Sequence, residues 1–189
     1  ENGAVIYDLP ANHARFAPGI DGAKITGLRA LRAFLDEQVL PRHDDACLQF
    51  GKEAQMSVFS ATPGRCFAPI QAAVEEWLAE HGGPELDISP SHFYLNLSLR
   101  GVDKGAAIRA LLGELGIDRA HAAGIGDTEG DLPLREAVSF FACPANARDC
   151  VKAVADYVSP WAELEGVMEI LARPELRAQG RIGWRGPKG

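Results

Sequence analysis

The sequence is poor in the features that mark membrane, secreted and nucleic-acid-binding proteins. No apolar run approaches the ~18 residues of a membrane-spanning helix, and no secretory leader is visible. The net charge of −7 argues against general nucleic-acid binding. A hydrophobic share of 47% and a charged share of 24% are ordinary for a globular protein. We therefore expect a cytoplasmic protein with no membrane and no nucleic-acid partner.

Cysteine is scarce and lacks the spacing of a metal site. The four cysteines form no C-x-x-C pair, which zinc sites and redox motifs commonly use. Cys47 and Cys143 lie in apolar runs. Buried free thiols are therefore favoured over disulfides or zinc ligands for Cys47, Cys66, Cys143 and Cys150. A reducing compartment fits this expectation.

Basic residues are outnumbered overall but gather in one segment. Residues 173–189 contain five basic residues and one acid, a local charge of +4. The segment could contact an acidic partner. Its glycine and proline content favours a flexible, solvated tail instead.

Two patterns of secondary structure divide the remaining chain. Residues 2–7 are expected to form a strand, and residues 8–25 a loop with room for one short strand. From Thr26, the expected N-cap, the pattern predicts a helix and two strands, twice over. Those helices are expected at 26–41 and 67–81, and the strands at 46–50, 55–60, 86–88 and 92–99. The order indicates a compact α+β unit, and alternating Phe93, Leu95, Leu97 and Leu99 predict an antiparallel sheet with one wet face.

After Lys104, strands alternate with helices. Helices are expected at 105–116, 132–137, 147–155 and 161–172, and strands at 120–125, 138–142 and 157–158. Such alternation predicts a parallel sheet with helices on both faces. The fold class is therefore α/β: a Rossmann-like core, beginning with the strand at 2–7, that the α+β unit interrupts. The expected domains are a core strand and linker (1–24), the α+β unit (25–99), the C-terminal part of the core (100–172) and the basic tail (173–189).

An acidic motif, Gly124-Ile125-Gly126-Asp127-Thr128-Glu129-Gly130-Asp131, carries the most chemical information. Asp127 and Asp131 follow a predicted strand, and α/β folds place ligands at the carboxyl ends of their strands. Two close carboxylates repel each other unless a cation lies near them, and hard oxygen ligands suit Mg²⁺. The alternative is a turn and helix N-cap, where aspartate is common.

A lysine at the start of a predicted helix complements this motif. Gly101-Val102-Asp103-Lys104-Gly105 offers Lys104 to a phosphate. The helix dipole disfavours a cation at this end, which favours a functional lysine over a merely solvated one. The two motifs together predict a magnesium-dependent phosphoryl-transfer site.

Both motifs, the preceding Asn2-Gly3-Ala4 and the repeated helix–strand–strand order resemble the haloacid dehalogenase (HAD) superfamily over about residues 1–172. The most similar subgroup has a type-2 cap and includes Cof-like and sucrose-phosphatase-like sugar phosphatases, so the α+β unit resembles that cap. The resemblance implies that Asp127 is a metal ligand and that Asp131 supports the metal shell. It also implies that Lys104 holds the nucleophile and neutralises charge on the phosphoryl group.

Two asparagines are further candidates through the same resemblance. Asn146 matches an asparagine that lines the cleft, and its alternative role is to cap the helix that follows. Asn2 is a candidate phosphate-binding residue, and its alternative is a turn. In the cap, Lys52, Arg65, His43 and His92 are candidates for substrate contact, although a surface role is favoured for each.

The resemblance places the catalytic aspartates ahead of Asn2-Gly3-Ala4. Asp8 imitates the attacking residue, but Pro10 stands where the second aspartate would be and cannot transfer a proton. The 189 residues are therefore expected to be the C-terminal part of a longer polypeptide. Without that missing N-terminal segment, which is their expected partner, they are expected to be inactive.

The expected function is a Mg²⁺-dependent phosphatase. It would hydrolyse a small phosphorylated metabolite, such as a sugar phosphate, through an aspartyl-phosphate. The alternatives are a non-catalytic binding module, which the lack of the first motif favours, and a phosphomutase on the same scaffold.

Overall fold

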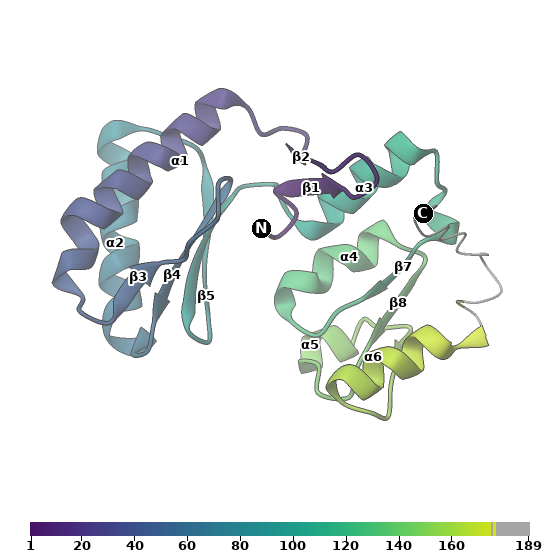
Figure 1. Ribbon diagram of the computed structural model, residues 1–189. Coiled ribbons are helices and arrows are strands. Elements are labelled where there is room, and N and C mark those ends of the chain that lie inside the picture. The colour runs from purple at the N-terminus through teal and green to yellow at the C-terminus, as the bar shows by residue number, and fades with distance from the viewer. Residues whose placement is uncertain (175, 177–189) are drawn as a thin grey trace. The chain divides into compact units, whose positions relative to one another are not determined.

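The computed structural model describes residues 1–174 and residue 176, which fall into two compact units that divide between Val102 and Asp103 (Figure 1). Most of the predicted basic tail, 173–189, lies outside the described residues. In the described part of the chain, no helix is long and apolar enough to cross a membrane.

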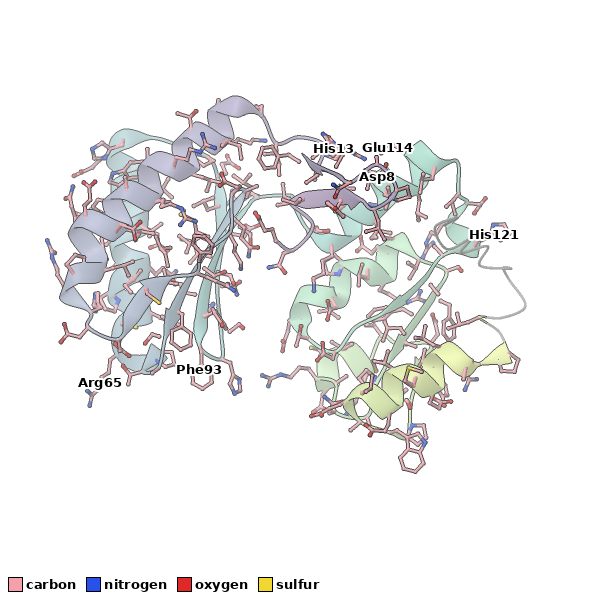
Figure 2. All side chains as sticks on the ribbon, viewed as in Figure 1. Asp8, His13, Arg65, Phe93, Glu114 and His121 are labelled. Atoms are coloured by element: carbon pink, nitrogen blue, oxygen red, sulfur yellow. The ribbon has the colours of Figure 1, made fainter. Side chains whose placement is uncertain are left out.

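The first unit begins with a hairpin of β1 (Val5–Asp8) and β2 (His13–Phe16), which pair antiparallel. Asp8 lies opposite His13 at the end of the hairpin (Figure 2). Its Oδ1 accepts a hydrogen bond of 3.1 Å from the backbone N–H of Ala11 in the turn. The short strand for which the sequence left room is thus β2. The predicted start of a parallel core is instead one half of an antiparallel hairpin.

The rest of the first unit is a four-stranded antiparallel sheet with the strand order β3-β4-β6-β5. Its elements follow the predicted order: α1 (Gly22–Phe34), β3 (Ala46–Leu48), β4 (Gln55–Ser60), α2 (Pro63–His81), β5 (Leu86–Ser91) and β6 (Tyr94–Leu99). Figure 1 shows α1 and α2 side by side along this sheet.

The helix α1 begins earlier than its apolar pattern predicts. Its N-cap is Asp21, whose side chain accepts a hydrogen bond of 2.9 Å from the backbone N–H of Lys24. The predicted N-cap was wrong: Thr26 lies inside the helix, where its hydroxyl donates to the carbonyl of Gly22 at 2.8 Å. The helix continues as a π-helical segment over Leu35–Val39, which extends the buried face that the leucines define.

The main core of the first unit lies between the helices and the sheet. On β6, Leu95, Leu97 and Leu99 are buried, whereas the alternate side chains are partly exposed. This period of two is the predicted pattern for the three leucines, because successive side chains of a strand point to opposite faces. Phe93, the first residue of the predicted alternation, precedes β6 and is exposed, so the prediction was wrong for this residue. The leucines pack in one cluster with residues of the helices and of β4, including Leu28, Leu31, Leu35, Met56, Val58, Ile70 and Val74.

The second unit is built on a parallel sheet with the strand order β7-β8-β9. Its strands are β7 (Ala123–Ile125), β8 (Phe140–Cys143) and β9 (Tyr157–Val158), and its helices are α3 (Lys104–Leu115), α4 (Leu132–Ala137), α5 (Asp149–Lys152) and α6 (Glu163–Ala172). In Figure 1, α4 lies on one side of β7 and β8, and α6 lies on the other. The predicted alternation of strands and helices is therefore present.

The strand β7 is shorter than predicted because a 3₁₀ turn precedes it. Arg119–His121 form that turn, and the Asp118 side chain caps it by accepting from the backbone N–H of Ala120 at 2.7 Å. The capping aspartate gives the chain local bonds that compete with extension of the strand.

All four cysteines are free thiols. Cys66 and Cys143 are buried, as expected of small apolar side chains. Cys47 and Cys150 are exposed, so the prediction that both are buried was wrong. Cys47 lies in β3. The physical reason is the strand alternation, since only Ala46 and Leu48, its two neighbours, pack against the core.

Candidate functional site

The acidic motif forms the connection from β7 to α4 at the carboxyl end of the parallel sheet. Gly126 follows β7 directly, and Glu129–Asp131 form a 3₁₀ turn that leads into α4. Asp131 Oδ2 accepts backbone hydrogen bonds from Asp127 (3.0 Å) and Thr128 (3.2 Å). Asp131 and Thr128 form a capping box, so the N-cap alternative that the sequence left open describes part of what Asp131 does.

Asp131 also pairs with the predicted lysine. Lys104 Nζ donates to Asp131 Oδ1 at 2.5 Å. The Asp131 side chain is only 9% exposed, whereas that of Lys104 is 37% exposed. Asp103 caps α3 by accepting from the backbone N–H of Ala106 at 2.7 Å, which fixes Lys104 as the first residue of that helix. The structure therefore joins two motifs that lie 27 residues apart.

The two aspartates carry opposite pKa shifts. Burial acts to raise the pKa of Asp131, but the hydrogen bond from Lys104 and those from the backbone N–H groups of Asp127 and Thr128 outweigh it and hold the pKa below its ordinary value. Burial raises the pKa of Asp127, and the negative charge of Asp131 raises it further. Asp131 is thus a fixed anion, while Asp127 is a carboxylate that a nearby cation would stabilise.

A cavity of about 540 Å³ opens beside these groups, within the second unit. Four of the predicted site residues line it together: Lys104, Asp127, Asp131 and Asn146. Asn2 belongs to the first unit and stands in a turn, with φ of 46°. Its role in phosphate binding stays a prediction.

Asn146 holds the N-terminus of α6. Its Oδ1 accepts a hydrogen bond of 2.7 Å from the backbone N–H of Glu163, the first residue of that helix. The capping alternative expected the helix directly after Asn146, which is α5. The residue capped is instead 17 positions further along the chain. Asn146 therefore combines a cap with a place on the cavity wall.

The cavity includes a carboxylate that the sequence analysis missed. Glu163 lines it at the start of α6 and has a φ of 48°, in the left-handed region. No motif in the sequence marks this position, because the fold of the β9–α6 connection, and not a local pattern, brings Glu163 to the cavity. The remaining wall comes from Ile125, Gly126, Pro144 and Val167.

Backbone hydrogen bonds fix the two loops that form the floor of the site. Gly126 N donates to Ala142 O at 3.1 Å, and Arg148 N donates to Asp127 O at 2.9 Å. The first bond joins the end of β7 to β8. The second ties the acidic motif to the loop that carries Asn146, so that the two side chains reach one cavity.

The side chains that line the cavity supply only some of the oxygen ligands that Mg²⁺ requires. Among the described residues, no group of three or more His, Cys, Asp or Glu side chains could hold a metal ion. Both oxygens of Asp131 are already engaged, which leaves the Asp127 carboxylate as the direct ligand. Mg²⁺ keeps several waters and uses one or two carboxylates together with substrate phosphate. The donor set is thus compatible with Mg²⁺ bound by Asp127, with Asp131 in support.

The four cap candidates all lie in the first unit. Lys52 is half-buried, and its Nζ donates to Ser57 Oγ at 2.7 Å. Burial lowers the pKa of Lys52, and the charge of Glu1 opposes that shift. Arg65 and His92 are exposed, and Arg65 points outward (Figure 2). His43 is partly buried, and substrate contact stays a prediction for all four.

Comparison with known proteins agrees with this geometry. A model of the haloacid dehalogenase-like hydrolase family matches residues 69–171, more than half of the chain. The chain belongs to this family. The match includes the acidic motif, Lys104 and Asn146.

Curated relatives match over part of their length. The phosphoglycolate phosphatase of Methanothrix thermoacetophila is 36% identical over 97 residues, which are 51% of this chain and 43% of the relative. That of Methanospirillum hungatei is 33% identical over 101 residues, 53% of this chain and 44% of the relative. The chain thus matches less than half the length of these relatives.

A solved structure supports the fold. The haloacid dehalogenase-like hydrolase from Bacteroides thetaiotaomicron superposes with a TM-score of 0.67 at 16% identity, and the alignment covers 90% of this chain and 73% of the other. Identity at this level shows a shared fold. The predicted α/β architecture of this family is therefore confirmed.

Proposed function

We propose that this chain carries the metal- and phosphate-binding half of a Mg²⁺-dependent phosphatase that acts on a small phosphorylated metabolite. The observation that carries the proposal is the joint placement of Lys104, Asp127 and Asp131 at the carboxyl end of β7, beside one cavity. A cation and two carboxylates at one edge of a parallel sheet are suited to phosphoryl transfer, where catalysis is mostly positioning and charge stabilisation.

Each residue has a distinct task in this proposal. Asp127 binds the metal ion, because Lys104 hydrogen-bonds to Asp131 and acts on Asp127 only through its charge, which does not outweigh the burial and the negative charge of Asp131 that raise the Asp127 pKa. Asp131 holds Lys104 through the 2.5 Å hydrogen bond and fixes the loop through its backbone bonds. Lys104 presents positive charge to the phosphoryl group. Bound Mg²⁺ would supply the remaining neutralisation of phosphate charge.

The proposal requires a carboxylate that attacks phosphorus to give an aspartyl-phosphate. Asp8 does not suit this task, because it is exposed and holds the hairpin turn at Ala11. Asp131 is locked in its own hydrogen bonds. We infer that the attacking aspartate comes from a further segment of the polypeptide, so that the 189 residues alone are inactive.

The substrate is proposed as a class. The curated relatives are named phosphoglycolate phosphatases, which supports a small phosphate monoester. The cavity of about 540 Å³ is of a size suited to such a molecule. Phosphoglycolate and sugar phosphates are therefore the first substrates to test.

The proposal is tested on the complete gene product with a generic aryl phosphate, with and without Mg²⁺. Hydrolysis should require Mg²⁺, and Asp127→Ala should lower turnover by roughly 100-fold or more, since even partners of metal ligands contribute 10–100-fold. Glu129→Ala is the matched control: Glu129 is exposed in the same motif and is not part of the cavity wall. Unchanged turnover of Asp127→Ala would overturn the site. Phosphate moved to a second position of a sugar, without release, would indicate a phosphomutase.

A further inference from the structure

Glu163 lines the cavity of the proposed site, but the proposed function gives it no task. The other charged side chains on the wall are committed: Lys104 pairs with Asp131, and Asp127 is the proposed metal ligand. Glu163 uses its backbone N–H, which donates to Asn146 Oδ1 at 2.7 Å. Among the residues that the structure describes, no hydrogen bond or ion pair engages its carboxylate. This carboxylate is therefore open to a ligand in the cavity.

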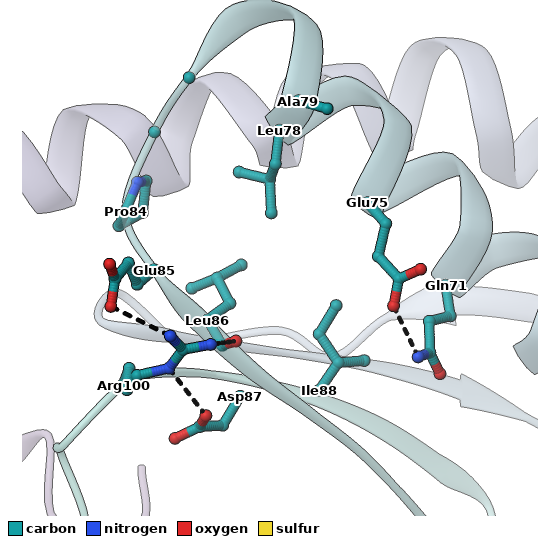
Figure 3. A pocket seen from close by; sticks show the side chains of 12 residues that line it. Gln71, Glu75, Leu78, Ala79, Pro84, Glu85, Leu86, Asp87, Ile88 and Arg100 are labelled. Carbon is teal, nitrogen blue, oxygen red and sulfur yellow. Dashed lines mark hydrogen bonds and ion pairs between the residues drawn. The ribbon is translucent and has the colours of Figure 1, made fainter.

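The carboxylates of another cavity are held in a different way. A groove of about 660 Å³ lies between α2 and β5 in the first unit (Figure 3). There, Arg100 Nη1 pairs with Glu85 at 3.1 Å and Arg100 Nε pairs with Asp87 at 3.3 Å, so that one guanidinium holds both acidic side chains. No cation in the described part of the chain does this for Glu163, and its charge stays uncompensated at the cavity wall.

The backbone at Glu163 is unusual for its residue type. Glu163 is the first residue of α6 and has a φ of 48°, a left-handed conformation that residues other than glycine, asparagine and aspartate rarely adopt. The cap from Asn146 and a bond of 2.8 Å from Ala145 N to Trp161 O hold this connection in place. Glycine would adopt the same conformation without a steric cost. Strained residues gather at functional sites, so the Glu163 side chain is a candidate for substrate contact.

The groups that line the cavity with Glu163 favour one kind of substrate. Since Asn146 Oδ1 accepts from the backbone, its Nδ2 group is left as a hydrogen-bond donor. Pro144 and Val167 add apolar surface. An ionised carboxylate only accepts hydrogen bonds, so Glu163 can bind a hydroxyl group, and it repels a group of negative charge. The wall thus suits a phosphate ester whose remaining part is uncharged and carries hydroxyl groups.

We propose that Glu163 is a specificity-determining residue of this cavity. Its carboxylate accepts a hydrogen bond from a hydroxyl group of the substrate, and it repels a phosphate ester that carries a second negative charge. This proposal rests on the proposed phosphatase function and chooses between the two substrates named there. It favours a sugar or polyol phosphate over phosphoglycolate, whose carboxylate would meet the like charge of Glu163.

Two small esters test this on the complete gene product with Mg²⁺. In 2-hydroxyethyl phosphate, a hydroxymethyl group stands where phosphoglycolate has its carboxylate. The parent should have the higher kcat/KM for 2-hydroxyethyl phosphate. Glu163→Gln should shift the ratio of the two kcat/KM values about fivefold toward phosphoglycolate, the upper range for one exposed charge pair, and added salt should reduce this shift. Glu165→Gln is the matched control, because Glu165 is exposed on the first turn of α6 and does not line the cavity.

A second variant separates specificity from a structural role. Glu163→Gly removes the carboxylate and suits a φ of 48°, so it should fold like the parent in chemical denaturation and shift the ratio in the same direction. A ratio that stays unchanged in both variants would overturn the role of Glu163, while hydrolysis of both esters would leave the proposed function standing. An equal gain for both esters would also overturn it, because Glu163 would then repel the phosphate itself. A parent that hydrolyses neither ester would overturn the proposed function, and this inference with it.

Discussion

Gly126 and Asp131 lie so close together that a Cβ atom at position 126 would be 2.4 Å from the Cβ of Asp131. The same atom would be 3.1 Å from the ring of Phe141 on β8. Asp131 can therefore reach back over the end of β7 only because residue 126 has no side chain. This contact places the Asp131 carboxylate where Lys104 and the backbone N–H groups of the loop meet it.

Gly126→Ala should displace Asp131 and destabilise the second unit by about 1–3 kcal/mol, the usual cost of overpacking. Gly130→Ala is the control within the same motif, since its Cβ would meet only Thr128 Oγ1 at 3.9 Å. That variant should stay within about 0.5 kcal/mol. Chemical denaturation measures both, and an equal loss in the two variants would contradict the steric argument.

Lys104 and Asp131 are expected to be energetically coupled. Lys104→Met leaves a buried carboxylate without its cation and should cost about 1–3 kcal/mol of unfolding free energy. Asp131→Asn removes the charge and keeps an acceptor for the backbone N–H groups. In the double variant the two losses should not add, because the second change removes a partner that is already lost. Simple additivity in this double-mutant cycle would show that the 2.5 Å contact contributes nothing.

The two aspartates should respond to pH in opposite ways. The lowered folded-state pKa of Asp131 stabilises the fold above the ordinary aspartate pKa of 3.8, and this contribution is lost as the pH falls through the lowered value. The raised pKa of Asp127 has the opposite sign: its ionisation opposes folding once the pH rises above 3.8. At neutral pH, Asp131→Asn should therefore destabilise the chain and Asp127→Asn should stabilise it. Unfolding at a series of pH values measures both, and two changes of the same sign would contradict this assignment.

The sequence predicted the order of helices and strands well in segments where the apolar pattern extends over many residues. The helix and strand order of both units, the buried leucines of β6 and the ends of α4 and β9 all follow from local pattern. The sequence also predicts Lys104 and Asp131 as site residues, because Lys104 stands at the start of a predicted helix and Asp131 follows a predicted strand. Their hydrogen bond gives that identification a physical basis.

The rest depended on contacts between residues far apart in sequence. The leucine pattern predicts Thr26 as the N-cap of α1, whereas Asp21 makes the capping bond. Glu163 reached the cavity through the crossover to α6, which no local pattern encodes. The capping partner of Asn146 could not be read from its neighbours for the same reason.

Asn146 offers a test that separates its structural role from a role in phosphate binding. Asn146→Ala leaves the N–H of Glu163 without its acceptor and should cost about 0.5–2 kcal/mol. Asn146→Asp keeps an acceptor oxygen at the start of α6, where the helix dipole favours negative charge, so stability should be largely retained. The added charge would nevertheless repel a phosphate in the cavity. In the complete gene product, Asn146→Asp should therefore raise KM for a phosphate ester while its unfolding free energy stays near that of the parent. An unchanged KM in this variant would restrict Asn146 to capping.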